Sequence, residues 1–171
     1  MLNDSHTEFI IELIRATNCD IYLELGIDDG WNISKIVPYC NKCIGVDIVD
    51  NRYHYGYEFH KMSSSDFLNK FKEKADIIFI DANHNFEYVK TDLLNALKVL
   101  NKYGIILIHD TDPSSLYYSS DKYCGDSYKI INWIKTCYSE LNVVTLPIGV
   151  TGLTIVNRDK ERRVYEYISE T

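Results

Sequence analysis

Acidic residues recur at the points where predicted β-strands end. Asp47, Asp81 and Asp110 each close or follow a short apolar run, and Asp28 lies in the loop after a fourth run, Ile21 to Leu25. Carboxylates are unfavourable inside β-strands, whereas the carboxyl ends of parallel strands are where such sheets bind ligands. Four acids at these positions predict a site for a cationic ligand, for a metal ion, or for both.

The elements that must position these acids alternate regularly. Short runs rich in β-branched residues are separated by segments of helical periodicity, and the runs that end at Ile80 and Ile108 are apolar at every position, as in central parallel strands. The predicted strands are Ile21 to Leu25, Cys43 to Ile48, Tyr57 to Met62, Ile77 to Ile80, Ile105 to Ile108, Val143 to Leu146 and Leu153 to Val156. The sequence therefore predicts an α/β fold, a Rossmann-like doubly wound sheet with helices on both faces.

Turn and helix-capping residues between the predicted strands support this order. A capping box at Ser5 to Glu8 predicts an N-terminal helix within residues 1–20. A second helix should stop before Gly104, and a third should begin near Asp126. Glycine and proline, with no helical stretch, separate the last two strands, which predicts an antiparallel hairpin at the sheet edge. We expect one domain over residues 1–171, with a cofactor-binding core at 21–158.

The loop from Glu24 to Gly30 distinguishes two cofactor classes. A dinucleotide fold has Gly-x-Gly-x-x-Gly here because bare backbone must approach a pyrophosphate. In this chain the middle glycine is absent, and Asp28 and Asp29 would repel phosphates. S-adenosylmethionine has no phosphate and carries two cationic groups, so acids near its methionine end are favourable. Asp47, 21 residues beyond Gly26, is spaced to accept hydrogen bonds from ribose hydroxyls.

Three motifs resemble those of class I S-adenosylmethionine-dependent methyltransferases: Glu24-Leu25-Gly26-x-x-x-Gly30, Gly45-Val46-Asp47 and Phe79-Ile80-Asp81. The resemblance runs from about Ile21 to Arg158 and implies a seven-stranded sheet whose last strand is antiparallel. It also implies that the segment beginning at Ser63 contacts the adenine. The expected cofactor-binding residues are Glu24, Gly26, Ile27, Asp28, Gly30, Asp47, Ile48, Ser63, Ser64 and Asp81.

The stretch from Ile80 to Glu87, together with Ile108-His109-Asp110-Thr111, resembles a narrower group of small-molecule O-methyltransferases, several of which act on sugars or natural products. This resemblance implies that Asp81 and Asp110 hold a divalent cation and that His84 serves as the base. Thr111 stands where relatives commonly have Asn or a second Asp, and we expect it to complete the metal site. A cation such as Mg²⁺ would lower the pKa of an acceptor hydroxyl, and His84 would then remove its proton. We expect His109 to be a packed, hydrogen-bonded histidine rather than a ligand.

The composition of the chain argues against some classes of binding partner and indicates the cellular compartment. The 171 residues carry 18 Lys plus Arg against 25 Asp plus Glu, a net charge of −7, which argues against nucleic acid or an anionic membrane as partner. The N-terminus has no signal-peptide pattern, and the five cysteines are odd in number and scattered, so we expect a cytoplasmic protein with reduced thiols. Cys40 and Cys43 have the spacing of a zinc or redox pair, but no second pair or nearby His completes four ligands.

The predicted function is methylation of a hydroxyl on a small molecule such as a sugar. The polar segment 112–125, with three tyrosines, is the candidate acceptor loop, and a homodimer could complete the acceptor site. Two alternatives stay open: an NAD-dependent oxidoreductase, for which a third glycine is expected in the first loop, and a catalytically silent binding protein with the same fold. The presence of Asp81, His84 and Asp110 argues against the silent protein.

Overall fold

The computed structural model describes residues 5–158, so the predicted single domain of residues 1–171 extends beyond the described residues at both ends. A seven-stranded sheet forms its centre, in the order β3-β2-β1-β4-β5-β7-β6. The strands are β1 (Ile21–Leu25), β2 (Lys42–Asp47), β3 (Glu58–Lys61), β4 (Ala75–Ile80), β5 (Leu100–His109), β6 (Asn142–Leu146) and β7 (Leu153–Asn157). All neighbours are parallel except β7, which is antiparallel to both β5 and β6. The predicted fold, including the terminal hairpin, is confirmed.

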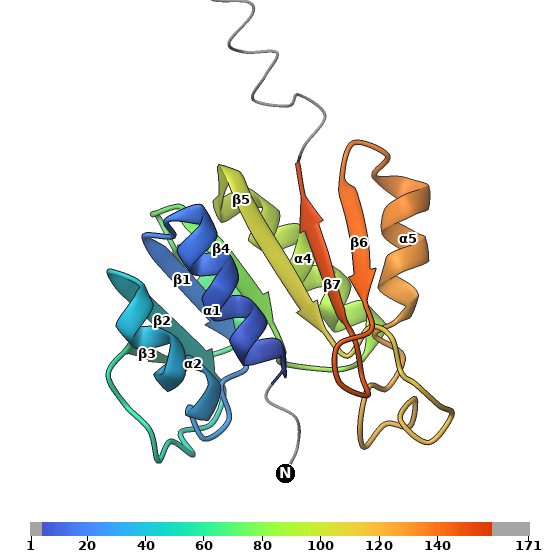
Figure 1. Cartoon of the computed structure of the whole chain (residues 1–171), viewed down its shortest axis with the longest axis horizontal. Helices are drawn as coiled ribbons and strands as arrows, with labels where there is room; N and C mark the ends of the chain where they lie inside the picture. The colour runs from blue at the N-terminus through green and yellow to red at the C-terminus, as the bar shows by residue number, and fades with distance from the viewer. Residues whose placement is uncertain (1–4, 159–171) are drawn as a thin grey trace, which may run out of the picture.

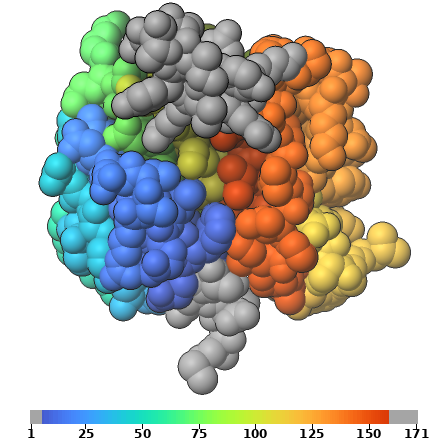
Figure 2. All heavy atoms as spheres, turned by 45° about the horizontal axis from the view of Figure 1, so that its top comes forward, coloured from blue at the N-terminus to red at the C-terminus, as the bar shows by residue number. Residues whose placement is uncertain are grey.

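Helices cover both faces of the sheet (Figure 1). On one face lie α1 (Ser5–Thr17), α2 (Trp31–Ile36) and the short 3-10 helix η1 (Val37–Tyr39), and on the other lie α3 (Ser64–Lys70), α4 (Phe86–Val99) and α5 (Lys129–Cys137). Because side chains alternate along a strand, β4 sends Ile78 and Ile80 into one core and Ile77 and Phe79 into the other. In the space-filling view, α1 (blue) lies beside the terminal hairpin (orange and red) (Figure 2). Within residues 5–158, no helix is long and apolar enough to cross a membrane.

Strand register brings the acids together. Leu25 of β1 pairs with Val46 of β2 and with Ile80 of β4, and Ile80 pairs with Ile108 of β5. The next residue of each strand therefore lies in one row: Gly26, Asp47, Asp81 and His109. The sheet thus creates a polar edge from residues that are far apart in the sequence.

Two predicted helix boundaries are confirmed to within a few residues, but the marker residues Gly104 and Asp126 have other roles. The helix predicted to stop before Gly104 ends at Val99, and β5 begins at once, so Gly104 lies inside a strand, where a Cβ atom would meet the Leu100 side chain at 2.7 Å. The helix predicted near Asp126 begins at Lys129. Asp126 instead accepts a hydrogen bond from the backbone N–H of Phe86 (2.6 Å), at the start of α4. The Asp126 side chain thus binds the start of α4 through a tertiary contact, whereas the local pattern placed it at the start of the helix that follows it.

Asp92 is a buried acid away from the polar edge. It lies on α4 with 6% of its surface exposed, and the Ser64 hydroxyl of α3 donates a hydrogen bond to it. Burial raises the pKa of Asp92 to about 6, and the Ser64 bond only partly opposes this. In the unfolded chain the group titrates near its ordinary value of 3.8. The folded state therefore binds more protons between these values, and stability falls as pH rises through that interval.

We expect Asp92→Asn to raise the free energy of unfolding at pH 7 by about 2 kcal/mol, because the amide keeps an acceptor for Ser64 without a buried charge. Urea denaturation at pH 7 and pH 4 measures the effect, which should vanish at pH 4. The control is Glu12→Gln, which removes an exposed carboxylate of α1 and should change stability by no more than about 0.5 kcal/mol. Equal changes in the two variants would contradict the assignment.

Candidate active site

The loop between β1 and α2 is held against the end of β4 by close backbone contact. Gly26 has φ +86°, and a Cβ atom there would lie 2.3 Å from the carbonyl oxygen of Asp81. Gly30 has φ +79°, and its Cβ would lie 2.0 Å from the Tyr57 hydroxyl. Both glycines are therefore required sterically, and the first one forms part of the contact between the loop and the end of β4.

Asp47 organises this loop from the neighbouring strand. One of its carboxylate oxygens accepts hydrogen bonds from the backbone N–H groups of Ile27 (3.0 Å) and Asp28 (3.1 Å). The other accepts from the N–H of Val49 at 3.0 Å. The Ile27 side chain is buried in the core, whereas Ile48 is 68% exposed. The acid predicted to bind a ribose thus also sets the shape of the loop that would lie beside it.

Glu24 is the centre of a buried network rather than an open carboxylate. It is 2% exposed and accepts hydrogen bonds from Tyr22 (2.6 Å) and Asn32 (2.7 Å), and Thr7 of α1 donates to Asn32 at 2.7 Å. Burial raises the pKa of Glu24 to about 8. At neutral pH this side chain is mostly protonated, so Glu24 adds little negative charge to the loop.

The two serines predicted to contact adenine begin α3. The Ser63 hydroxyl accepts a hydrogen bond from the backbone N–H of Asp66 (3.1 Å) and donates to its carboxylate (2.8 Å), which caps the helix. The Ser64 hydroxyl donates to Asp92. Both side chains are therefore engaged within the fold.

Asp81, His84 and Asp110 converge. One ligand atom from each lies within 4.8 Å of the other two, the one such group of His, Cys, Asp or Glu side chains among residues 5–158. His84 Nε2 lies 3.1 Å from an Asp110 oxygen and 3.7 Å from an Asp81 oxygen. Asp110 is 4% exposed and has φ +59°, so its backbone turns sharply just after β5. Two carboxylates and an imidazole at these distances fit a divalent cation.

The backbone of the candidate acceptor loop orients His84. The carbonyl oxygen of Tyr123 accepts a hydrogen bond from His84 Nδ1, so Nδ1 carries the hydrogen and Nε2 faces the two acids. The nearby Asp81 carboxylate, together with the charge of Asp110, raises the pKa of His84 to about 9. Without a metal ion the ring is therefore protonated at neutral pH and balances the carboxylates.

His109 lies between the same two carboxylates. Its Nδ1 is 3.0 Å from Asp81 and 3.3 Å from Asp110, and its ring packs 5.8 Å from that of Phe79. Burial lowers the pKa of His109, but the two acids outweigh that effect and raise it to about 9. Burial also raises the pKa of Asp81, yet His109 and His84 hold it below its usual range. The sequence predicted packing and hydrogen bonds for His109 but not its position between the acids. That position follows from strand register, because Ile80 pairs with Ile108 and the next residues are Asp81 and His109.

Thr111, predicted to complete the metal site, has hydrogen-bond partners within the fold. It is 1% exposed, its hydroxyl accepts a hydrogen bond from Thr154 at 2.7 Å, and it contacts the carbonyl oxygen of Ile108 at 3.4 Å. His84 thus lies beside the two acids, and the role of Thr111 as a third metal ligand stays a prediction.

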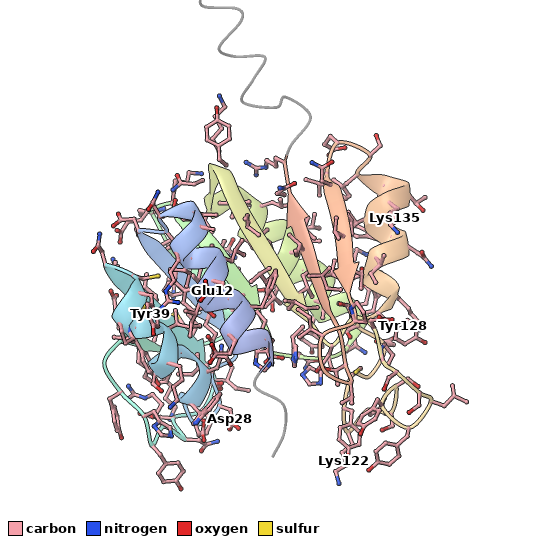
Figure 3. All side chains as sticks on the ribbon, viewed as in Figure 1. Glu12, Asp28, Tyr39, Lys122, Tyr128 and Lys135 are labelled. Atoms are coloured by element: carbon pink, nitrogen blue, oxygen red, sulfur yellow. The ribbon has the colours of Figure 1, made fainter. Side chains whose placement is uncertain are left out.

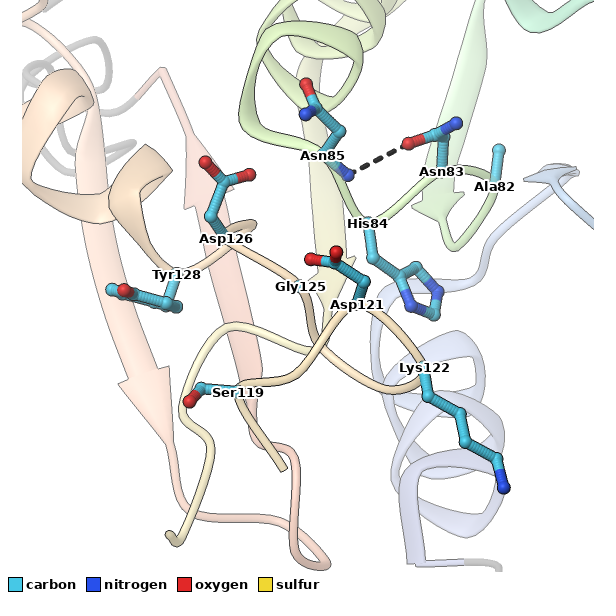
Figure 4. Close-up of a pocket in the computed structure, with 10 residues that line it drawn as sticks. All are labelled: Ala82, Asn83, His84, Asn85, Ser119, Asp121, Lys122, Gly125, Asp126 and Tyr128. Atoms are coloured by element: carbon cyan, nitrogen blue, oxygen red, sulfur yellow. Dashed lines mark hydrogen bonds between the residues drawn. The ribbon is translucent and has the colours of Figure 1, made fainter. Parts of the chain in front are cut away.

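The loops that surround the cluster lie at one end of the sheet, where Asp28, Lys122 and Tyr128 are labelled in Figure 3. Between the β4–α4 loop and segment 119–128 there is a cavity of about 580 Å³ (Figure 4). Its lining consists of Ala82, Asn83, His84, Asn85, Ser119, Asp121, Lys122, Gly125, Asp126 and Tyr128. The N–H of Asp126 donates to the His84 carbonyl at 3.1 Å. The candidate acceptor loop therefore contacts the acid cluster and lines a polar cavity next to it.

A parallel sheet with an antiparallel β7, a glycine loop after β1 and acids after β2, β4 and β5 defines a Rossmann-like methyltransferase fold. Residues 19–111, more than half of the chain, match a family described as a methyltransferase domain. The chain belongs to this methyltransferase family. No curated protein matches it by sequence.

Solved structures share the fold at low sequence identity. A cofactor-bound protein from MTB has a TM-score of 0.78 at 14% identity, covering 94% of this chain and 83% of that one. An O-methyltransferase from Bacillus cereus in complex with SAH has a TM-score of 0.71 at 15% identity, covering 93% and 83%. The O-methyltransferase TomG from Streptomyces achromogenes, in complex with SAM, has a TM-score of 0.65 at 14% identity, covering 90% and 79%. At such identities the likeness establishes the fold.

We expect Gly26→Ala to lower the free energy of unfolding by about 3 kcal/mol or more, because the new methyl group would overlap the Asp81 carbonyl and the backbone is left-handed. Gly56→Ala is the matched control: its φ is also positive, at +109°, but its Cβ would meet only the Val37 side chain, at 3.6 Å. Urea unfolding compares the two. Equal losses would show that Gly26 is needed only for its φ angle.

Proposed function

We propose that the protein transfers a methyl group from S-adenosylmethionine to a hydroxyl of a polar small molecule, with a divalent cation held by Asp81, His84 and Asp110. The observation that carries the proposal is the convergence of these three side chains within 4.8 Å, next to the loop that contains Gly26. The three side chains lie beyond the carboxyl ends of the parallel strands, where sheets of this kind bind ligands.

The cofactor assignment is supported by charge. Asp28 and Asp29 stand in the loop where a dinucleotide would need to approach with its phosphates, and they favour the cationic methionine end of S-adenosylmethionine. Two structures with the same fold contain SAM or SAH. The proposed contact residues are Glu24, Gly26, Ile27, Asp28, Gly30, Asp47, Ile48, Ser63, Ser64 and Asp81. Since the Glu24 carboxyl and the Ile27 side chain are buried, we propose that both act by shaping the loop.

The role of each residue around the cation follows from its contacts. A bound divalent cation would lower the pKa of an acceptor hydroxyl. Tyr123 holds His84 so that Nε2 faces the acids, and His109 Nδ1 hydrogen-bonds to Asp81 and lies 3.3 Å from Asp110. With a cation held by His84 Nε2, that nitrogen would not take the acceptor proton, which would instead pass to solvent water. The predicted role of His84 as base would apply where Asp81 and Asp110 hold the cation without it, with Nε2 unprotonated.

The acceptor is proposed to occupy the cavity beside His84. The side chains of Asn83, Asn85 and Asp121 and the hydroxyl of Tyr128 offer donors and acceptors there, with little apolar surface. Such a lining suits a molecule with several hydroxyl groups, such as a sugar, better than a flat aromatic ring. Because the cysteines in residues 5–158 are free thiols, we place the reaction in the cytoplasm. A homodimer stays a prediction.

Formation of S-adenosylhomocysteine from S-adenosylmethionine tests the proposal, with sugars, nucleotide sugars and phenols as acceptors. We expect activity with a polyhydroxylated acceptor, loss of at least 100-fold in excess EDTA, and recovery with Mg²⁺ or Mn²⁺. Asp110→Asn should cause a similar loss while S-adenosylmethionine binding by calorimetry stays within about twofold. Full activity in EDTA would exclude the metal, and absence of S-adenosylmethionine binding to the wild type would exclude the cofactor.

His109→Leu should weaken Mn²⁺ binding by about tenfold or more, because the carboxylates lose the N–H that orients them. His109→Asn is the matched variant, since its amide nitrogen stands near the position of Nδ1, and it should recover most of the affinity. Titration of Mn²⁺ followed by electron paramagnetic resonance measures both. If the two variants bind Mn²⁺ equally, His109 acts only by packing.

A further inference from the structure

Three cysteines meet at the amino ends of β1 and β2, the end of the sheet opposite the acid cluster. Cys19 lies between α1 and β1, Cys40 follows η1, and Cys43 is in β2. The sulfurs of Cys19 and Cys40 lie 3.7 Å apart, and Cys43 is near enough to affect the pKa of Cys40. A five-residue strand separates this cluster from the Gly26 loop by roughly 16 Å. The proposed methyl transfer uses none of these thiols.

The backbone around Cys19 and Cys40 is held together by independent contacts. The N–H of Lys42 donates to the carbonyl of Asp20 at 3.0 Å, and the Asn41 amide donates to its carboxylate at 2.6 Å. On the preceding turn of α1, the guanidinium of Arg15 lies 4.6 Å from the centre of the Tyr39 ring. The two sulfurs are therefore neighbours because their segments are tied together on both sides.

The thiols differ in accessibility and acidity. Cys40 is half-buried, whereas Cys19 and Cys43 are 6% and 7% exposed. The neighbouring thiols of Cys19 and Cys43 lower the pKa of Cys40, against the opposing effects of burial and of Asp76. The more accessible sulfur is thus the one that its neighbours stabilise as a thiolate, and the thiolate is the form that reacts with oxidants.

We propose that Cys40 and Cys19 form a peroxide-oxidisable pair that closes into a disulfide joining η1 to the end of α1. The Cys40 thiolate attacks one oxygen of hydrogen peroxide, the O–O bond breaks, and a sulfenic acid and hydroxide result. The Cys19 sulfur then attacks the Cys40 sulfur, the S–S bond forms, and the sulfenic oxygen leaves as water with the Cys19 proton. In total, two thiols and one peroxide give one disulfide and two waters.

The sulfurs must approach from 3.7 Å to about 2.05 Å, a movement within reach of side-chain rotation. The bridge would close a loop that contains β1 and α2, so it stabilises the fold by constraining the unfolded chain. Because it lies at the far end of β1, it should leave the cofactor loop unchanged. The inference does not depend on the proposed function.

The test treats the reduced full-length protein with a small excess of hydrogen peroxide, blocks remaining thiols and maps peptides by mass spectrometry. We expect a Cys19–Cys40 link, a mass loss of about 2 Da from the paired thiols, and a Tm increase of about 5 °C that dithiothreitol reverses. Cys43→Ser should still form the link. Cys19→Ser should stop at a sulfenic acid on Cys40 that dimedone traps, with no rise in Tm.

Exposed Cys137 is the internal control, because it lies on α5 away from the other cysteines and should remain a thiol under the same treatment. Should Cys19→Ser fail to fold, Cys40→Ser replaces it, and it should show neither link nor sulfenic acid at the cluster. A Cys40–Cys43 link, oxidation of Cys137 before Cys40, or no intramolecular link in the wild type would each overturn the proposal.

Discussion

The repulsion between two carboxylates that parallel register forces together governs the polar edge of this protein. Because Ile80 of β4 pairs with Ile108 of β5, Asp81 and the residues after Ile108 must emerge side by side. Like charges so close are unfavourable unless cations face them. The fold supplies His109 at the end of β5 and His84 from the loop before α4, both within 4 Å of the carboxylates.

The rest of the edge is built to keep this arrangement in place. Gly26 lets the first loop approach the backbone of Asp81, and Asp47 ties that loop to β2 through backbone N–H groups. On the other side, the backbone of Tyr123 holds the His84 ring. The first loop, the acid cluster and the candidate acceptor loop are therefore in direct contact with one another.

The Gly26 loop lies where strand order reverses, and the acid cluster follows the next two strands, β4 and β5. β1 is flanked by β2 on one side and β4 on the other, and successive connections from these strands leave in opposite directions. A crevice opens at such a point in doubly wound sheets. Methyl transfer needs donor and acceptor held in contact with little covalent help from the protein, and a rigid sheet edge with two adjoining loops provides that positioning.

Apolar runs and turn residues by themselves determined the order of strands and helices and the row of acids, because burial and backbone sterics act locally. Long-range pairing decided the rest. Strand register brings His109 beside Asp81. The path of segment 112–125 places the Tyr123 carbonyl where it orients the His84 ring. Packing buries Glu24 and so keeps it mostly protonated. Thr111 shows the same limit, since its neighbour Thr154 comes from a strand 43 residues away and takes its hydroxyl. A sequence shows which residues can carry chemistry, whereas tertiary contacts decide which of them remain available for it.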